Sequence, residues 1–314
     1  MAIAVSPEFE KATYFKVAYR LIPFLFLCYI VAFLDRVNVG FAKLQMAGDL
    51  GYSDAMYGFG AGVFFIGYFI FEVPSNVILE RVGARMWIAR IMITWGLLSA
   101  STMFIETPLQ FYTVRFLLGV AEAGFYPGVI YYFAGWFPAC HRGRAVSRFF
   151  MASPLAAVVM GSISGWLLGL DGRGGLDGWQ WLFLVQGLPS VCVGLLVLVL
   201  LPDSPRRVGW LSKPEQDWIE GELAREQSLI GEPARHSVLA AFRNPRVLML
   251  GTTGFLIIGA VTTFNLSAPM ILIDRAGLDV TQAGYLTAIG GLLGAGAIVL
   301  AGNHADRHGD RWVN

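Results

Sequence analysis

The stretch 21–42, LIPFLFLCYIVAFLDRVNVGFA, decides the fold, because it is long and apolar enough to cross a membrane as one helix. Two adjacent charges, Asp35 and Arg36, stand inside it. Charged side chains are costly within a membrane helix and by default mark a functional site. We therefore place this pair at the centre of the candidate site. An ion pair that only locks two helices together is the competing interpretation.

The composition of the whole chain is typical of a protein that crosses the membrane several times. Of its 314 residues, 56% are hydrophobic and 14% are charged, and the mean hydropathy is +0.59. The net charge is +1, and no basic patch with interleaved aromatic residues is present, so we expect no nucleic-acid partner. The cysteines, Cys28, Cys140 and Cys192, are far apart and predict neither a disulfide framework nor a metal site. Charges throughout residues 1–20 favour an uncleaved first span over a signal peptide.

The apolar runs predict eight membrane spans and hence an all-α polytopic membrane protein. These spans are Leu21–Ala42, Met56–Leu79, Met86–Ile105, Leu109–Phe137, Ala145–Leu170, Trp179–Leu201, Val247–Ile273 and Thr281–Gly302. Most lysines and arginines outside the spans fall on the side that holds the N-terminus, and only Lys43, Arg173 and Arg275 fall on the other. The positive-inside rule therefore predicts a cytoplasmic N-terminus.

A repeated loop divides the chain into two halves. The pattern acid-Arg-x-Gly-x-Arg follows the second span and recurs after the eighth. We expect a six-helix bundle over 1–201, a cytoplasmic loop over 202–246 and the start of a second bundle over 247–314. In the loop, Ser212 and Glu215 form the pattern of a capping box and predict a surface helix over 217–226. Because glycine permits a tight turn and the charged pairs can latch helix ends, the repeated loops are predicted to form a cytoplasmic gate. Its residues are Glu80, Arg81, Gly83, Arg85, Asp306, Arg307, Gly309 and Arg311.

The fourth span carries a second pair of charges, Arg115 and Glu122. Seven residues separate them, so they share one helical face, and Gly119 between them permits close approach of another helix or a ligand. By their positions along the spans, Asp35, Arg36 and Arg115 lie at similar depth, with Glu122 nearer the middle of the membrane. We expect the two acids and two arginines to form one neutral network, because uncompensated charges are not tolerated there.

Other polar residues in the spans are weaker candidates. Tyr68 can donate its hydroxyl to a substrate or simply pack. Asn265 and Ser267, in the seventh span, lie near the predicted depth of Arg36 and can bind substrate or join helices by hydrogen bonds. Ser153-Pro154 can line the cavity or only bend the fifth span. Glu72 is interpreted as a gate or latch residue.

Several of these motifs resemble one family of membrane transporters. The repeated loop and the two-half plan resemble the major facilitator superfamily. Three runs resemble its anion:cation symporter family, whose members include permeases for tartrate, sugar acids and aromatic acids; they are Leu34–Ala42, Gly67–Asn76 and Gly178–Phe183.

The resemblance implies roles for individual residues. Arg36 would bind a substrate carboxylate, Asp35 and Glu122 would carry protons, and Arg115 would tune Glu122. It also implies twelve helices, so the chain holds the first six and about two of the second half, as if truncated at its C-terminus. Departures from the family pattern are Glu80 in place of aspartate, Asn76 in place of glycine and Gln186 in place of glutamate.

The sequence therefore predicts a secondary transporter of a bacterial inner membrane that takes up a small organic acid anion with protons. Arginine suits this task because its guanidinium stays charged and grips a carboxylate with two hydrogen bonds. Two alternatives stay open: an organic anion exchanger without proton coupling, and a membrane receptor or non-transporting remnant. No cofactor is expected. An enzyme is not expected either, because the zinc-protease, nucleophile-elbow and ATP-loop motifs are missing from the sequence.

Overall fold

The computed structural model describes residues 6–230 and 244–308, except for the side chains of 230, 265, 266, 295, 298, 299 and 301–308. Every regular element in these ranges is a helix. The helices are α1 (Pro7–Asp49), α2 (Asp54–Val82), α3 (Ala84–Ser101), η1 (Thr102–Phe104), α4 (Pro108–Glu122), α5 (Phe125–Ala134), α6 (Ala139–Phe150), α7 (Ala152–Leu168), η2 (Arg173–Gly175), α8 (Gly178–Leu200), η3 (Pro205–Arg207), α9 (Lys213–Ile230), α11 (Pro245–Ala276) and α12 (Val280–His308).

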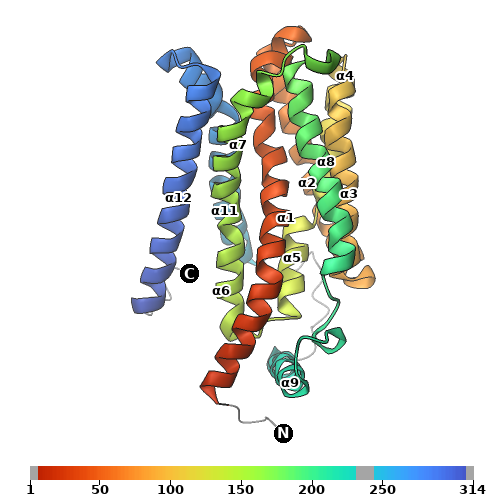
Figure 1. The fold of residues 1–314 in the computed structure, drawn as a ribbon, viewed down its shortest axis with the longest axis vertical. Coiled ribbons are helices and arrows are strands. Elements are labelled where there is room, and N and C mark those ends of the chain that lie inside the picture. Colours follow the sequence, from red (N-terminus) through yellow and green to blue (C-terminus); the bar gives the residue numbers. More distant parts are fainter. Residues whose placement is uncertain (1–5, 231–243, 309–314) are drawn as a thin grey trace.

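The helices form an upright bundle around α1, with α9 lying across one end of it (Figure 1). Within the bundle α3 packs on α8 and α2 packs on α4, while α12 packs on α7 and α11 on α1. Seven helices of the described part are long and apolar enough to cross a membrane. The eighth predicted span forms α12, which this criterion does not select in the described residues.

The first helix is longer than the predicted span. It begins at Pro7, where the Ser6 hydroxyl accepts a hydrogen bond from the Phe9 N–H and proline occupies the first turn. It ends at Asp49, so its 43 residues extend over roughly 65 Å at ~1.5 Å per residue. This exceeds the thickness of a bilayer, and α1 therefore carries contacts beyond the membrane at both ends.

The fourth predicted span is wrong as a single helix, because it is broken at Gly124 between α4 and α5. Gly124 has a positive φ of 87°, which suits glycine. Pro127 explains the break, because its ring clashes with the carbonyl of Ala123 and it offers no N–H to that oxygen. The Ser75 hydroxyl from α2 donates to the freed Ala123 carbonyl at 2.6 Å. The break is thus built from local sequence and stabilised by a neighbouring helix.

The fifth predicted span also contains a break, and it starts earlier than expected. It begins at Ala139 rather than Ala145, and α6 gives way to α7 at Met151. Pro154 lacks the N–H that would pair with the carbonyl of Phe150, the last residue of α6. Bending of this span by Pro154 is confirmed.

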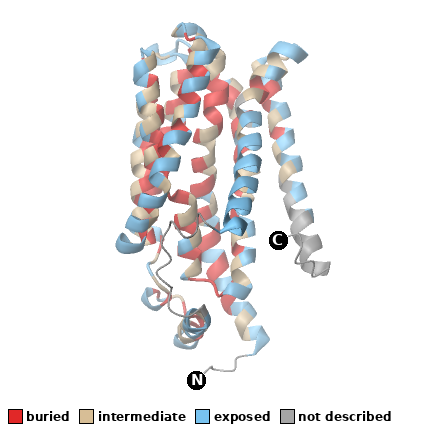
Figure 2. Cartoon of the chain, turned by 180° about the vertical axis from the view of Figure 1, so that it is seen from behind, coloured by how far each residue is buried: buried red, intermediate tan, exposed pale blue. Residues whose placement is uncertain are grey.

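Two apolar clusters fill the bundle, one toward the α9 end and one toward the opposite end. Along α1 the first cluster ends at Ala32 and the second begins at Val37. The same gap recurs in α4 between Leu118 and Phe111, and in α8 the first cluster resumes only at Val193. Buried polar residues occupy the gap; they are Asp35, Asn38, Ser99, Arg115, Gln186 and Ser190. We call this set, with Arg36 and its ion-pair partner Glu122, the polar layer. Figure 2 shows the buried residues gathered where the helices face one another and exposed residues along α11.

The predicted surface helix is confirmed and extends over α9. The Glu215 carboxylate accepts a hydrogen bond from the Ser212 N–H at 2.6 Å, as the capping box requires. The same carboxylate accepts from Lys16 of α1 at 2.8 Å. Partial burial opposes ionisation of Glu215, but its bonds to Lys16 and Ser212 outweigh this effect and hold its pKa below the usual value. Arg142 and Glu226 add a two-pronged ion pair, with both N–O distances 2.9 Å.

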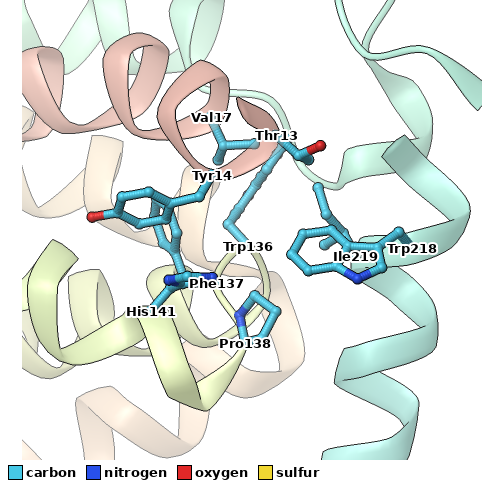
Figure 3. Close-up of a pocket in the computed structure, with 9 residues that line it drawn as sticks. All are labelled: Thr13, Tyr14, Val17, Trp136, Phe137, Pro138, His141, Trp218 and Ile219. Carbon is cyan, nitrogen blue, oxygen red and sulfur yellow. The ribbon is translucent and has the colours of Figure 1, made fainter. Parts of the chain in front are cut away.

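A small cavity remains where α9 meets the bundle (Figure 3). Residues of α1, of the junction before α6 and of α9 line it, among them Thr13, His141 and Trp218. Its volume is about 10 Å³, enough for one water molecule but not for an organic acid. The structure therefore does not support this cavity as a substrate site.

Small residues bring α12 against α7. A Cβ atom at Gly161 would lie 3.0 Å from the backbone nitrogen of Ala288, and one at Gly291 would lie 2.6 Å from the Pro154 carbonyl oxygen. Such close approach is typical of membrane helices that pack through glycine. Gly291 is thus a packing position, whereas Gly290 has open space around it.

Candidate functional site

The polar layer centres on an ion pair between α1 and α4. The Nε and Nη2 atoms of Arg36 both lie 2.6 Å from Oε1 of Glu122. The Glu122 side chain is 2% exposed, whereas that of Arg36 is 31% exposed. The carboxylate is thus enclosed by protein, while part of the Arg36 side chain remains accessible.

Asp35 turns away from this pair although it is the neighbour of Arg36 in sequence. Its Oδ1 accepts a hydrogen bond from Asn38 at 3.1 Å and another from the Ser99 hydroxyl of α3. The residue is 3% exposed. Because successive residues of a helix point about 100° apart, one dipeptide serves two different neighbours, with Asp35 facing α3 and Arg36 facing α4.

Arg115 does not pair with Glu122 in the described structure. Its guanidinium carbon lies 4.8 Å from the centre of the Phe64 ring, and its Nε has no hydrogen-bond partner among the described residues. Arg36 lies 6.0 Å from the same ring. The predicted similar depth of the two arginines agrees with this shared aromatic contact, but the partner of Glu122 is Arg36. Any effect of Arg115 on Glu122 acts without a direct ion pair.

Aromatic rings of α2 form the wall beside Arg36, and Gly119 of α4 lets that helix come close. Tyr68 lies under the guanidinium, whose central carbon is 5.1 Å from its ring, a distance typical of a cation–π contact. A Cβ atom at Gly119 would lie 2.8 Å from the Tyr68 backbone nitrogen and would overlap the Phe64 carbonyl oxygen. Gly119 thus permits close approach as predicted, and what it admits is helix α2.

The helix break after Glu122 completes the site, and sequence reasoning missed it. The Ala121 carbonyl, next to the break, accepts a hydrogen bond from Arg90 of α3 at 3.5 Å. Ser75, which bonds the Ala123 carbonyl, also accepts from the Trp87 indole at 2.9 Å. The signal was present as Gly124-x-x-Pro127, a pattern that ends one helix and starts another.

Gln186 of α8 also belongs to the polar layer. It is buried, its amide nitrogen lies 2.8 Å from the Met160 sulfur, and its amide oxygen has no partner in the described part of the chain. It thus leaves an acceptor free in the layer, at the position where the family pattern has glutamate.

The seventh predicted span contributes less that can be described. Ser267 lies on α11 and is half-buried. The side chain of Asn265 lies outside the described residues. No described contact joins Ser267 to the polar layer, and the roles of Asn265 and Ser267 stay predictions.

The first of the two predicted gate loops is organised around Arg85. Gly83 ends α2 with a positive φ of 92°. Arg85 pairs with Asp203, just beyond α8, at 3.0 Å. Glu80 and Arg81 are exposed and form no ion pair with any described residue. In the second loop the side chains of Asp306 and Arg307, and the whole of Gly309 and Arg311, lie outside the described residues.

One group of side chains in the described part has the composition of a metal site. Glu10, Cys140 and His141 offer ligand atoms within 4.8 Å of one another. His141 Nε2 lies 2.8 Å from the Glu10 carboxylate, a hydrogen-bond distance that explains the grouping. The N-terminus of α6 and Arg142 add positive charge beside it, which opposes a cation. We assign no metal to this group.

Known proteins agree with the helical plan and the resemblance. Residues 25–313 match the Major Facilitator Superfamily. The chain belongs to this family. NicT of Pseudomonas putida, named as a metabolite transport protein, is 49% identical over 96% of this chain and 69% of its own length. A protein of Agrobacterium vitis named for tartrate transport is 45% identical over 98% of this chain and 70% of its own. The quinolone resistance transporter of Acinetobacter baumannii is 42% identical over 97% and 70%.

Solved structures of the superfamily share the fold. A bacterial homologue of the human lysosomal transporter Spinster, inward-facing and occupied, matches with a TM-score of 0.69 and 19% identity. The match covers 93% of this chain and 62% of that one. The D-xylose–proton symporter matches with a TM-score of 0.60 and 18% identity, over 94% of this chain and 69% of that one. The chain is therefore an integral membrane protein with the major facilitator fold.

Proposed function

We propose that this chain is a proton-coupled transporter that takes up a small organic anion. The observation that carries the proposal is the pair of Arg36 and Glu122, in which an enclosed carboxylate holds an arginine whose side chain stays partly accessible. An incoming carboxylate of a substrate competes with Glu122 for the same guanidinium, and Glu122 is freed to take a proton. Relatives named for tartrate and metabolite transport support this class of substrate.

Other residues of the candidate site receive supporting roles in this proposal. Tyr68 stacks under Arg36 and offers its hydroxyl to a substrate bound there. Asp35 is a second proton carrier, because it is buried and bonded only to uncharged groups among the described residues. Ser267 contacts substrate from the second half. Arg115 adds positive charge to the site without forming an ion pair with a described carboxylate.

The placement in the cell belongs to the same proposal. Arg85, Arg142 and Lys16 all lie at the α9 end of the bundle, where they pair with Asp203, Glu226 and Glu215. Concentration of positive charge at one end favours a cytoplasmic α9 end and N-terminus in a bacterial inner membrane. We retain the division into a bundle over 1–201, a loop over 202–246 and a second bundle starting at 247.

One observation favours an exchanger as the second candidate. Arg36 and Arg115 both contact the Phe64 ring, and Arg115 has no ion-pair partner among the described residues. Two arginines around one cavity can bind a dianion or two anions in turn. In an exchanger no carboxylate needs to carry a proton.

The test measures internal pH and labelled-acid uptake in vesicles that contain the chain. Organic acids are added outside one at a time. We expect acidification with at least one acid and its loss in Asp35→Asn. Uptake should fall about tenfold or more in Arg36→Lys, because lysine keeps the charge but loses the fork, and a charge-assisted hydrogen bond contributes about 1.5–3 kcal/mol.

Arg173→Lys is the matched control, since it makes the same exchange at an exposed arginine. Labelled uptake without acidification would replace the symporter with the exchanger. Wild-type uptake by Arg36→Lys would contradict the role of the guanidinium. The absence of both labelled uptake and acidification with every acid tested would refute transport by this chain.

A further inference from the structure

A third carboxylate, Glu72, lies on the face of α2 that looks toward the site. Tyr68, Glu72 and Ser75 stand at helical spacing and share this face. Tyr68 contacts the Arg36 guanidinium, and Ser75 bonds the Ala123 carbonyl at the break in the fourth span. Glu72 is therefore placed between the ion pair and the helix break, one turn from Arg36 toward the α9 end.

The Glu72 carboxylate lacks the partners that its location demands. Its Oε2 is shielded from solvent and has no hydrogen-bond partner among the described residues. It forms no ion pair with any residue that the structure describes. An unpaired carboxylate within a membrane span is costly unless it carries a proton or gains a cation.

Among the described charges of the site, Glu72 is the acid that no arginine balances. The two acids and two arginines of the site balance one another, and Glu72 adds a third acid. From α3, Arg90 stacks on Trp87, 3.8 Å from its ring centre, and donates to the Ala121 carbonyl. From α5, glycines face α2, with Gly128 against Leu79. Arg36 of α1 and Glu122 of α4 are thus the charged residues whose partner exchange can involve Glu72.

We propose that Glu72 is a second acceptor for Arg36. This inference rests on the proposed proton-coupled function. When Glu122 takes up a proton, it no longer holds the guanidinium, which moves by about one helical turn, ~5–6 Å, from Glu122 to Glu72. Glu72 gives up its own proton toward the α9 end as it accepts Arg36. One proton enters and one leaves, and Arg36 stays charged throughout. Glu72 acts through Arg36 and is a positioning residue.

A double-mutant cycle on thermal unfolding of the purified chain in detergent tests this exchange. In each of Glu72→Gln and Glu122→Gln, Arg36 keeps one carboxylate acceptor. The melting temperature of each single variant should therefore fall only slightly. The double variant leaves Arg36 without an acceptor, and its melting temperature should fall by about 3 °C or more beyond the sum of the two singles. Glu106→Gln, which neutralises an exposed carboxylate, is the matched control. Strict additivity would overturn the proposal.

A second arm keeps the test decisive if the double variant does not fold. At alkaline pH, where both carboxylates are ionised, Arg36→Gln leaves two negative charges about one helical turn apart without a cation, so adding Glu72→Gln should raise the melting temperature there. A purely structural Glu72 would give no such rescue. The pH dependence of melting in Glu122→Gln should become smaller once Glu72 is also neutralised, and an unchanged pH dependence would contradict the relay. These readouts do not need flux, so failure of the relay is distinguishable from failure of the proposed transport.

Discussion

Replacement of Gly119 by alanine should loosen the contact between α2 and α4 that holds the site together. The Cβ of alanine would overlap the Phe64 carbonyl oxygen and lie 2.8 Å from the Tyr68 nitrogen. Both atoms belong to the backbone of α2, so no side-chain rotation relieves the overlap. The two helices must separate, and Glu122 on α4 moves with them relative to Tyr68.

The magnitude follows from two opposing effects. Overpacking of a close helix contact costs about 1–3 kcal/mol, while alanine in place of glycine gains up to about 1 kcal/mol in a helix. Gly62→Ala separates these effects, because Gly62 lies on α2 with open space around it. The difference in unfolding free energy between Gly119→Ala and Gly62→Ala is therefore expected to equal the overpacking cost, about 1–3 kcal/mol.

Reversible unfolding of both variants in mixed detergent micelles measures this difference. Gly67→Ala provides an independent check, because its Cβ would lie 3.2 Å from the Val120 nitrogen and press the same two helices apart. The variant that combines Gly67→Ala and Gly119→Ala should lose less unfolding free energy than the two single variants together, because one separation of α2 from α4 relieves both overlaps. Equal stability of Gly119→Ala and Gly62→Ala would refute the reasoning.

Two other measurements address the helix break and the α9 contact. Ser75→Ala leaves the Ala123 carbonyl and the Trp87 indole without their partner, and should lower unfolding free energy by about 1–3 kcal/mol; Ser147→Ala, an exposed serine, is the control. Because the pKa of Glu215 is held below its usual value, its bond to Lys16 stabilises the docked α9 at neutral pH and is lost as pH falls below about 4.5. Spin-label distances between α1 and α9 should therefore lengthen in acid, and Lys16→Ala should abolish that change.

The position of the polar layer between two apolar clusters explains how charges persist in this bundle. Each cluster excludes water from one side of the layer. Inside it, Arg36 pairs with Glu122 of α4, and Asp35 accepts a hydrogen bond from Ser99 of α3. The broken fourth span then ends α4 at Glu122 and exposes carbonyl groups that Ser75 and Arg90 satisfy.

The sequence by itself predicted the membrane spans, the surface helix and the buried charges of α1 and α4. Apolar runs of about twenty residues admit little besides a membrane helix, since every backbone group must be satisfied within it. A capping box is equally local, and Ser212 and Glu215 start α9 as predicted. The break at Gly124 was also encoded locally, in Pro127, and was missed because the apolar run continues through it.

Only the tertiary structure decided which charges meet. Arg36 and Glu122 are 86 residues apart in the chain. By predicted depth and helical face, Arg115, which lies on the same helix as Glu122, was an equally good partner for that carboxylate. The choice depends on how α1 rotates against α4 and on how closely Gly119 lets α2 approach. These are properties of side-chain packing between distant segments, which hydrophobic periodicity does not specify.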